Sequence, residues 1–268
     1  MTMALSSGLP GLPALPALPA LALLPGPPPP WAAAAMPASR RAAAVLPRAA
    51  AGAGIDLLVL GASAGGPAAI EAVLGDLGAG LEVPVVIAQH MPAAFTAGFA
   101  RRLDANLALP VREARHHERL RPGVAYIAPG GQHLRIERDG GALRAVLDAA
   151  AAGTHLSPSV DALFRSAAKA TGGRLAAVVL SGMGTDGAAA MAQLAGAGVP
   201  TIAQDGATSA IFGMPRAAIL AGGAGEVLPL QEIGPRLLAL LAAASYRPVA
   251  RSCPTRSTSS SCGNGLRR

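Results

Sequence analysis

Between residues 55 and 246, short apolar runs alternate with stretches of helical character, and this alternation restricts the possible fold more than any other feature. The apolar runs cover 55–60, 83–89, 174–180, 199–204 and 225–230. The helical stretches cover 67–77, 95–106, 158–171, 187–196, 214–221 and 231–244. Continuous apolar strands separated by helices are typical of a parallel sheet that is buried on both faces. The sequence therefore predicts a doubly wound α/β fold with a mostly parallel sheet.

One segment departs from this rhythm. Residues 133–148, "HLRIERDGGALRAVLD", alternate apolar and polar side chains around Asp139-Gly140-Gly141. A period of two on both sides of an Asp-Gly turn is typical of two antiparallel strands. We expect an exposed antiparallel hairpin beside the parallel sheet.

The two ends of the chain differ in composition from its middle. Residues 1–54 begin with a proline about every third position, which prevents a helix and predicts a Pro/Ala-rich disordered extension. Residues 247–268 are basic and rich in serine, which predicts a second disordered tail. The ends hold three and five basic residues and no acidic one, so 14 basic residues stand against all 15 acidic residues between 55 and 246. A globular domain over 55–246 is thus near neutral, which argues against nucleic-acid binding.

Cysteine usage and hydropathy bear on the location of the protein. Both cysteines, Cys253 and Cys262, lie in the serine-rich tail, so no disulfide framework or zinc site is indicated. The adjacent His116 and His117 lack the spacing of metal ligands. No stretch of about 18 apolar residues without proline is available to cross a bilayer. We expect a cytoplasmic protein without direct membrane insertion, and the residues imply neither a metal nor another cofactor.

The turn after the first apolar run contains a candidate nucleophile. Gly61-Ala62-Ser63-Ala64-Gly65 fits the pattern G-x-S-x-G in the strand-turn-helix context that this motif requires. Small flanking residues permit a tight turn that exposes the serine hydroxyl, while the next backbone amide can donate to an oxyanion. The motif predicts Ser63 as nucleophile and the amide of Ala64 as an oxyanion donor.

A histidine and an aspartate follow two other predicted strands. His90 directly follows the run over 83–89, and Asp186 lies shortly beyond Ser181, which directly follows the run over 174–180. The carboxyl ends of parallel strands lie at one edge of a sheet, where active sites collect. A hydroxyl, a base and a carboxylate that orients the base form the triad of a serine hydrolase. We therefore expect Ser63, His90 and Asp186 to form a catalytic site.

Each of these residues also has a simpler interpretation. Ser63 could be an ordinary turn serine, His90 could hydrogen-bond a carbonyl group, and Asp186 could only cap the helix that begins at 187. Asp205, after the next strand, is a rival for the carboxylate role. A dinucleotide site is disfavoured, because Ser63 stands where its second glycine belongs and no acidic residue ends the second strand.

Two further side chains receive weaker assignments. His133 starts the first strand of the predicted hairpin, and we expect it to be exposed. Arg216 lies at a helix start near the same sheet edge, where it could face an anionic group, although an ordinary surface arginine is the default expectation.

Several motifs closely resemble the catalytic domain of CheB-type chemotaxis methylesterases. They are "GASAGGPAAIEAVL", "IAQHMPAAFTAGFARRL", "LRPGVAYIAPGGQHL", "PSVDALFRSAAK", "SGMGTDGAAAM" and "ATSAIFGMPRAAI", and they span about 55–241 in order. The resemblance implies a methylesterase catalytic domain over 55–246 that hydrolyses γ-glutamyl methyl esters, and also a protein-glutamine glutaminase. The implied substrates are the cytoplasmic helices of methyl-accepting chemoreceptors. The family's triad falls on Ser63, His90 and Asp186, and its oxyanion-holding methionine falls on Met183.

The chain departs from this family in three places. Ala64 stands where threonine is frequent, and "LSPSVD" over 156–161 stands where many members have H-R-P-S-V-D, which removes positive charge. Residues 1–54 contain no Asp or Glu and are too short for the receiver domain that typical members carry. We expect a stand-alone catalytic domain. The alternatives are a serine esterase or amidase with another substrate, and a non-catalytic scaffold that binds chemoreceptor or kinase partners.

Overall fold

The computed structural model describes residues 54–149 and 157–245. The tail over 247–268 with its two cysteines, and all of the predicted N-terminal extension except Gly54, lie outside the described residues. The strands are β1 Leu57–Ala62, β2 Val85–Gln89, β3 Val111–Glu113, β4 Ala125–Ile127, β5 Gln132–Asp139, β6 Ala142–Ala149, β7 Leu175–Val179, β8 Thr201–Gln204 and β9 Glu226–Leu228. The helices are α1 Gly66–Leu77, α2 Ala93–Asn106, α3 Val160–Thr171, α4 Ala188–Gly196, α5 Met214–Leu220 and α6 Leu230–Ser245.

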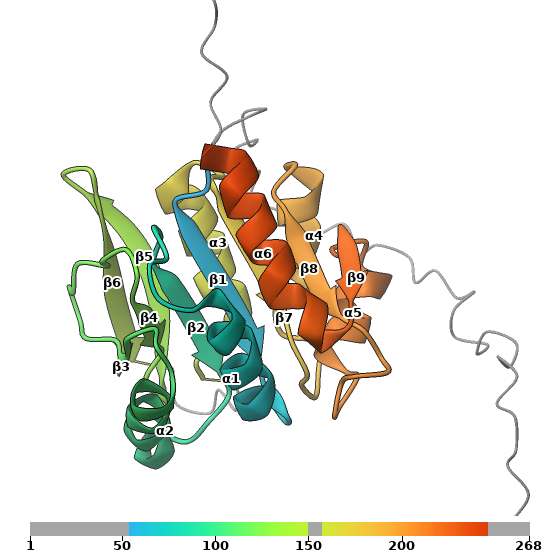
Figure 1. The fold of residues 1–268 in the computed structure, drawn as a ribbon, viewed down its shortest axis with the longest axis horizontal. Coiled ribbons are helices and arrows are strands. Elements are labelled where there is room, and N and C mark those ends of the chain that lie inside the picture. The colour runs from blue at the N-terminus through green and yellow to red at the C-terminus, as the bar shows by residue number, and fades with distance from the viewer. Residues whose placement is uncertain (1–53, 150–156, 246–268) are drawn as a thin grey trace, which may run out of the picture. The chain divides into compact units, whose positions relative to one another are not determined.

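Seven of the described strands form one parallel sheet in the order β3-β4-β2-β1-β7-β8-β9 (Figure 1). At its centre, Leu60 of β1 is in register with Ile87 of β2 and with Val178 of β7. The predicted doubly wound α/β fold is confirmed. Every predicted strand and helix is present, with its ends within two residues of the expected positions.

The sheet separates two hydrophobic layers, which explains why its strands are continuously apolar. Leu57 and Val59 point into a layer formed with α3, α4, α5 and the β5-β6 hairpin. Leu58 and Leu60 point into the opposite layer, formed with α1, α2 and α6. Because successive strand residues face opposite sides, a strand with helices on both faces needs an apolar residue at every position.

The hairpin is antiparallel, as predicted, and forms a sheet of its own. Its turn places Gly140 and Gly141 at φ values of +53° and +87°, which glycine adopts without the steric cost of a Cβ atom. The expectation that the hairpin is exposed is wrong for one face. Leu134 and Ile136 of β5 are buried in the layer that contains Phe164 of α3. Arg135 between them and Glu137 after them are exposed, so the alternation corresponds to a hairpin with one buried face.

Two strands of the sheet, β3 and β4, have no counterpart in the predicted pattern. Each has three residues, which is too short for a period of two to be recognised. β4 pairs with β2 and β3 pairs with β4, so the sheet extends beyond β2 through contacts between segments distant in sequence.

No helix among the described residues is long and apolar enough to cross a membrane.

The order of the strands creates a switch point beside β1. The chain first adds strands on the β2 side of β1 and later continues on the other side with β7, β8 and β9. Helix α1, which follows β1, packs on one face of the sheet, and α3, which precedes β7, packs on the other. Where helices diverge to opposite faces in this way, a crevice opens at the carboxyl ends of the adjacent strands, here β1 and β7, and ligands bind there in open α/β sheets. Ser63 and Ser181 follow these two strand ends.

Candidate active site

The turn after β1 holds Ser63 in a closely defined position. The Ser63 amide donates to the carbonyl of Ser181 at 3.0 Å, and the Ser63 carbonyl accepts from the amide of Gly66 at 2.9 Å. Gly65 has φ +79°, and a Cβ atom there would lie 2.6 Å from both the Ala210 Cβ and the Ser181 Oγ. Only glycine meets both demands. The turn therefore leaves a half-buried Ser63 at the edge of the sheet.

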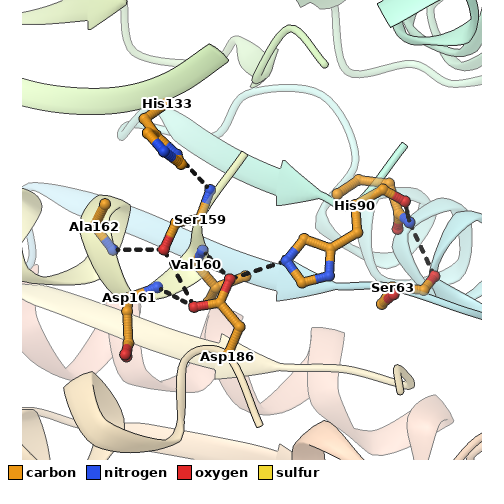
Figure 2. A network of polar contacts seen from close by, with 9 residues as sticks. Ser63, His90, His133, Ser159, Val160, Asp161, Ala162 and Asp186 are labelled. Carbon is orange, nitrogen blue, oxygen red and sulfur yellow. Dashed lines mark hydrogen bonds and ion pairs between the residues drawn. The ribbon is translucent and has the colours of Figure 1, made fainter. Parts of the chain in front are cut away.

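His90 follows β2 and is tied to the same turn. Its amide donates to the carbonyl of Ala62 at 3.0 Å. Its Nε2 donates to Oδ2 of Asp186 at 2.9 Å, and the two side chains are only 9% and 8% exposed. Its Nδ1 is buried and has no hydrogen-bond partner among the described residues. Figure 2 shows Ser63 and Asp186 on opposite sides of the imidazole ring.

The Asp186 carboxylate lies at the N-terminus of α3. Its Oδ2 accepts from the Val160 amide at 2.7 Å, and its Oδ1 accepts from the Asp161 amide at 3.0 Å and from Ser159 Oγ at 3.2 Å (Figure 2). The N-cap of α4 is Gly187, and none of the described hydrogen bonds to the Asp186 carboxylate comes from that helix. The interpretation of Asp186 as only a cap for its own helix is therefore wrong, because its carboxylate serves a different helix.

Competing effects set the pKa of Asp186. Burial raises it, because a carboxylate loses hydration in the interior. The hydrogen bonds from His90 and from the amides of Asp161 and Val160 lower it, and together they leave the pKa of Asp186 below its ordinary value. The free amides at the start of α3 also carry the positive end of the helix dipole. Asp186 is accordingly ionised at neutral pH beside His90.

Asp205, the rival carboxylate, lies in a turn of its own. Its Oδ1 accepts from the amide of Thr208 at 2.9 Å and from the Thr208 hydroxyl at 2.6 Å. It follows β8, which is three strand positions from β2 in the sheet. At about 4.8 Å per strand, its backbone is about 14 Å from that of His90. The fold brings His90 to Asp186 and leaves Asp205 at a distance.

The two predicted oxyanion donors lie on adjoining turns. Ser181 Oγ donates to the Ala64 carbonyl at 2.8 Å, which joins the turn after β7 to the turn after β1. Gly182 permits the close approach, since a Cβ atom there would lie 2.8 Å from Ser63 Cβ and 2.9 Å from Ser63 N. Ala64 and Met183 are exposed, and no acceptor among the described residues contacts their amides. Both amides thus remain available beside Ser63.

Several known proteins are similar to this chain over the region that contains the candidate site. The model of the CheB methylesterase family matches residues 58–237. The chain belongs to the CheB methylesterase family. Proteins named protein-glutamate methylesterase/protein-glutamine glutaminase from Moorella thermoacetica and Bordetella parapertussis are each 48% identical to it over 192 residues, or 71% of this chain. The match covers 45% and 55% of those proteins, so the chain spans about half the length of the curated relatives that it matches.

A solved structure leads to the same family. The crystal structure of the Thermotoga maritima CheB methylesterase catalytic domain superposes with a TM-score of 0.66 at 35% sequence identity. It covers 69% of this chain and 98% of the Thermotoga chain. The family resemblance inferred from the motifs is confirmed. The region matched to the CheB methylesterase model runs from β1 into α6, so it includes every residue of the site described above.

Several side chains of this candidate site were missed by sequence reasoning. Gln89 is 1% exposed, and its Nε2 donates to the carbonyls of Ser63 and His90, at 2.9 Å each. Ser181 joins two turns, and Ser159 contacts Asp186. Gln89 and Ser181 each follow an apolar run directly, so a polar residue at a strand end is a signal that could have identified them.

Two secondary assignments can also be compared with the structure. His133 was expected to be exposed, which is wrong: it is half-buried, and its Nδ1 accepts from the Ser159 amide at 3.1 Å. Arg216 is half-buried in the first turn of α5. That helix begins beside the site, since the Met214 amide donates to the Gly182 carbonyl at 2.8 Å. A role for Arg216 toward an anionic group stays a prediction.

Proposed function

We propose that this protein is a protein-glutamate methylesterase, with protein-glutamine glutaminase activity, in which Ser63, His90 and Asp186 form the catalytic triad. One observation carries the proposal. His90 is held by Asp186 through Nε2, while its buried Nδ1 has no other described partner and the ring separates Asp186 from Ser63. The activity named for the relatives at 48% identity supports the same reaction.

The hydrogen bond to Asp186 selects the nitrogen that acts as the base. A carboxylate can only accept, so Nε2 carries the proton in the Asp186 contact. Neutral His90 then has an unprotonated Nδ1, and this nitrogen takes the proton of the Ser63 hydroxyl. The charge of Asp186 stabilises the imidazolium that results. This assignment makes Nδ1 the base that faces the nucleophile.

In the first half of the reaction, Ser63 Oγ forms a bond with the carbonyl carbon of the γ-glutamyl methyl ester. The carbonyl oxygen becomes an oxyanion, which the amides of Ala64 and Met183 hold. Such donors stabilise charge that develops in the transition state, and each contributes about a hundredfold or more to the rate. Their position on a turn fixed by Gly65 and Gly182 means that they need little reorganisation during the reaction.

In the second half, the bond between the carbonyl carbon and the methoxy oxygen breaks. The proton on His90 Nδ1 passes to the departing methoxide and yields methanol. A water molecule then attacks the acyl-serine as His90 takes its proton, and glutamate is released with Ser63 restored. With a glutamine side chain, the leaving group is ammonia and the remaining steps are the same.

The position of the site supports a macromolecular substrate. Ala64 and Met183 are exposed, and the Met183 side chain is 70% accessible. A reacting group at such an open edge can be reached by a glutamyl side chain on the surface of another protein. We therefore assign as substrate the helical cytoplasmic region of methyl-accepting chemoreceptors, which places the reaction in the cytoplasm.

The test is methanol release from methylated chemoreceptor membranes by the full chain and by its Ser63→Ala variant. Release by the parent alone would support the reaction and the nucleophile together. Hydrolysis of p-nitrophenyl esters without methanol release would indicate an esterase with another substrate. Equal methanol release by both proteins would refute Ser63 as the nucleophile. Receptor binding without any hydrolysis would instead identify a scaffold.

A further inference from the structure

Ser159 connects the Asp186 carboxylate to the first turn of α3. Its Oγ donates to Asp186 Oδ1 at 3.2 Å and accepts from the Ala162 amide at 3.3 Å. Its own amide donates to His133 Nδ1 at 3.1 Å, which holds the residue from behind (Figure 2). A hydroxyl has one proton and two lone pairs. Since it accepts from Ala162, its proton is directed to Asp186.

We propose that Ser159 is a positioning residue of the reaction, which orients the Asp186 carboxylate toward His90, and that it does more than cap α3. The inference rests on the function proposed above, in which Asp186 orients His90. Ser159 does not contact the predicted reacting atoms, so it acts through Asp186.

The pattern of donors explains how the orientation is held. Oδ2 accepts from His90 Nε2 and from the Val160 amide, and Oδ1 accepts from the Asp161 amide and from Ser159 Oγ. Each oxygen therefore has two donors. Rotation of the carboxylate away from His90 would break several of these bonds together. Ser159 is the only side chain other than His90 that donates to this carboxylate among the described residues.

Several charged or titratable groups lie near Asp186, so the charge of the side chain at position 159 affects its carboxylate. His90 and Asp161 face Asp186, and His133 faces Ser159 from β5. The Asp161 carboxylate accepts from the Ala190 amide at the start of α4 and pairs with Arg165. Burial raises the pKa of Asp161, and the charge of Asp186 adds to this effect. A further negative charge at position 159 would act directly on Asp186.

Three variants at position 159 separate positioning from capping. Asparagine and aspartate are both strong N-caps, and both can accept from the Ala162 amide. Asparagine can also donate from its Nδ2 to Asp186, as the hydroxyl does. Aspartate has acceptors only and places a carboxylate against Asp186. Ser159→Ala removes the hydroxyl proton without adding a charge, so a residue that merely caps α3 should leave the pKa of Asp186 and the rate of Ser63 modification unchanged in this variant. Ser159→Asp would repel Asp186 in either case.

The measurements use the full chain. Carbon-13 titration of the Asp186 carboxyl group reports its pKa directly. The rate at which a fluorophosphonate modifies Ser63 at pH 7 reports activation of the nucleophile without any receptor. Methanol release from methylated receptor gives kcat and KM. Urea unfolding shows whether the variants remain equally folded.

If Ser159 positions Asp186, Ser159→Asp and Ser159→Asn should give different results. Ser159→Asp should raise the pKa of Asp186 by about one unit or more, as a like charge at hydrogen-bond distance does. It should slow Ser63 modification and lower kcat at least about tenfold, within the roughly 10⁴-fold limit for losing the orienting carboxylate, with KM little changed. Ser159→Asn should keep the pKa of Asp186 within about half a unit of the parent and retain at least about a tenth of its activity.

Ser166→Ala is the matched control. Ser166 lies in the same helix and also makes two hydrogen bonds, with the Leu163 carbonyl and the Ile136 amide, but it does not contact Asp186. It should leave the pKa of Asp186 and the modification rate unchanged.

Loss of the donor should raise the pKa of Asp186 and slow Ser63 modification in a folded Ser159→Ala variant. Values equal to those of the parent in titration and in Ser63 modification would overturn the positioning role. A parent that reacts with fluorophosphonate but releases no methanol would refute the proposed substrate alone, and the comparison of variants would still stand. A parent inactive in both assays would overturn both the proposed function and the role of Ser159 in catalysis.

Discussion

Gln89 provides a quantitative test of how the fold brings the predicted nucleophile and base together. Its Nε2 donates to the carbonyls of Ser63 and His90, and so it bridges the turns that follow β1 and β2. Its Oε1 is buried without a hydrogen-bond partner among the described residues. Gln89→Met keeps the length and the apolar stem of the side chain but removes both donors.

The structure indicates a small cost in stability. The Ser63 carbonyl keeps the Gly66 amide, so its loss is one hydrogen bond, or about 1 kcal/mol. The His90 carbonyl loses the only partner it has among the described residues, which costs about 1–3 kcal/mol. Gln89→Met also removes the buried Oε1 that has no partner, and this gain offsets a similar part of the cost of the unpaired His90 carbonyl. The free energy of unfolding should therefore fall by only about 1–2 kcal/mol.

The expected cost in catalysis is larger. Without the bridge, the one described hydrogen bond that still joins the two turns runs from the His90 amide to the Ala62 carbonyl. A displacement of about 1 Å between reacting groups can lower a rate about a hundredfold. We expect kcat for methanol release, and the rate of Ser63 modification by a fluorophosphonate, to fall about 10- to 100-fold.

Thr201→Val is the matched control for Gln89→Met. Thr201 is 2% exposed at the start of β8, and its hydroxyl accepts from the Gly225 amide at 2.9 Å, so its loss should cost a similar amount of stability. It lies at the opposite end of the strands from the site and should leave kcat within about twofold. Urea unfolding and turnover are measured on both variants. Equal kcat values for the two variants, at equal stability, would refute the view that Gln89 holds the site together.

Two further predictions concern the carboxylates. Asp186→Asn should lower kcat by up to about 10⁴-fold. Asp205→Asn should leave kcat within about threefold, because the Asp205 carboxylate contacts only its own turn among the residues that the structure describes. Methanol release measures both effects, and the reverse result would show that the wrong carboxylate was chosen. The lowered pKa of Asp186 stabilises the fold above its unfolded value of about 4, and this contribution is lost as the pH falls through the folded value. The pKa of Asp161 is raised, so its ionisation disfavours the fold as the pH rises. The free energy of unfolding, measured in urea, should therefore fall less steeply with decreasing pH in Asp186→Asn than in the parent, and more steeply in Asp161→Asn. The same dependence on pH in both variants would contradict these assignments.

Much of the fold could be predicted because its signals are local. Strands such as β1 and β7 are apolar at every position, since helices cover both faces, and this pattern is visible within a few residues. Strands β3 and β4 could not be predicted, because three residues hold no period and their pairing depends on distant segments. The hairpin was predicted, but the alternation of apolar and polar residues could not show that α3 covers its apolar face.

The sequence by itself determined which side chains stand at the carboxyl ends of the strands, and therefore that Ser63, His90 and Asp186 lie at one edge. Only the tertiary structure decided what each of them contacts. The carboxylate of Asp186 belongs to the N-terminus of α3, some 26 residues away in the chain, rather than to the adjacent helix α4. Helix amides without internal partners can donate to any carboxylate that packing brings near. Local sequence does not encode that choice, because it depends on how α3 packs across the sheet.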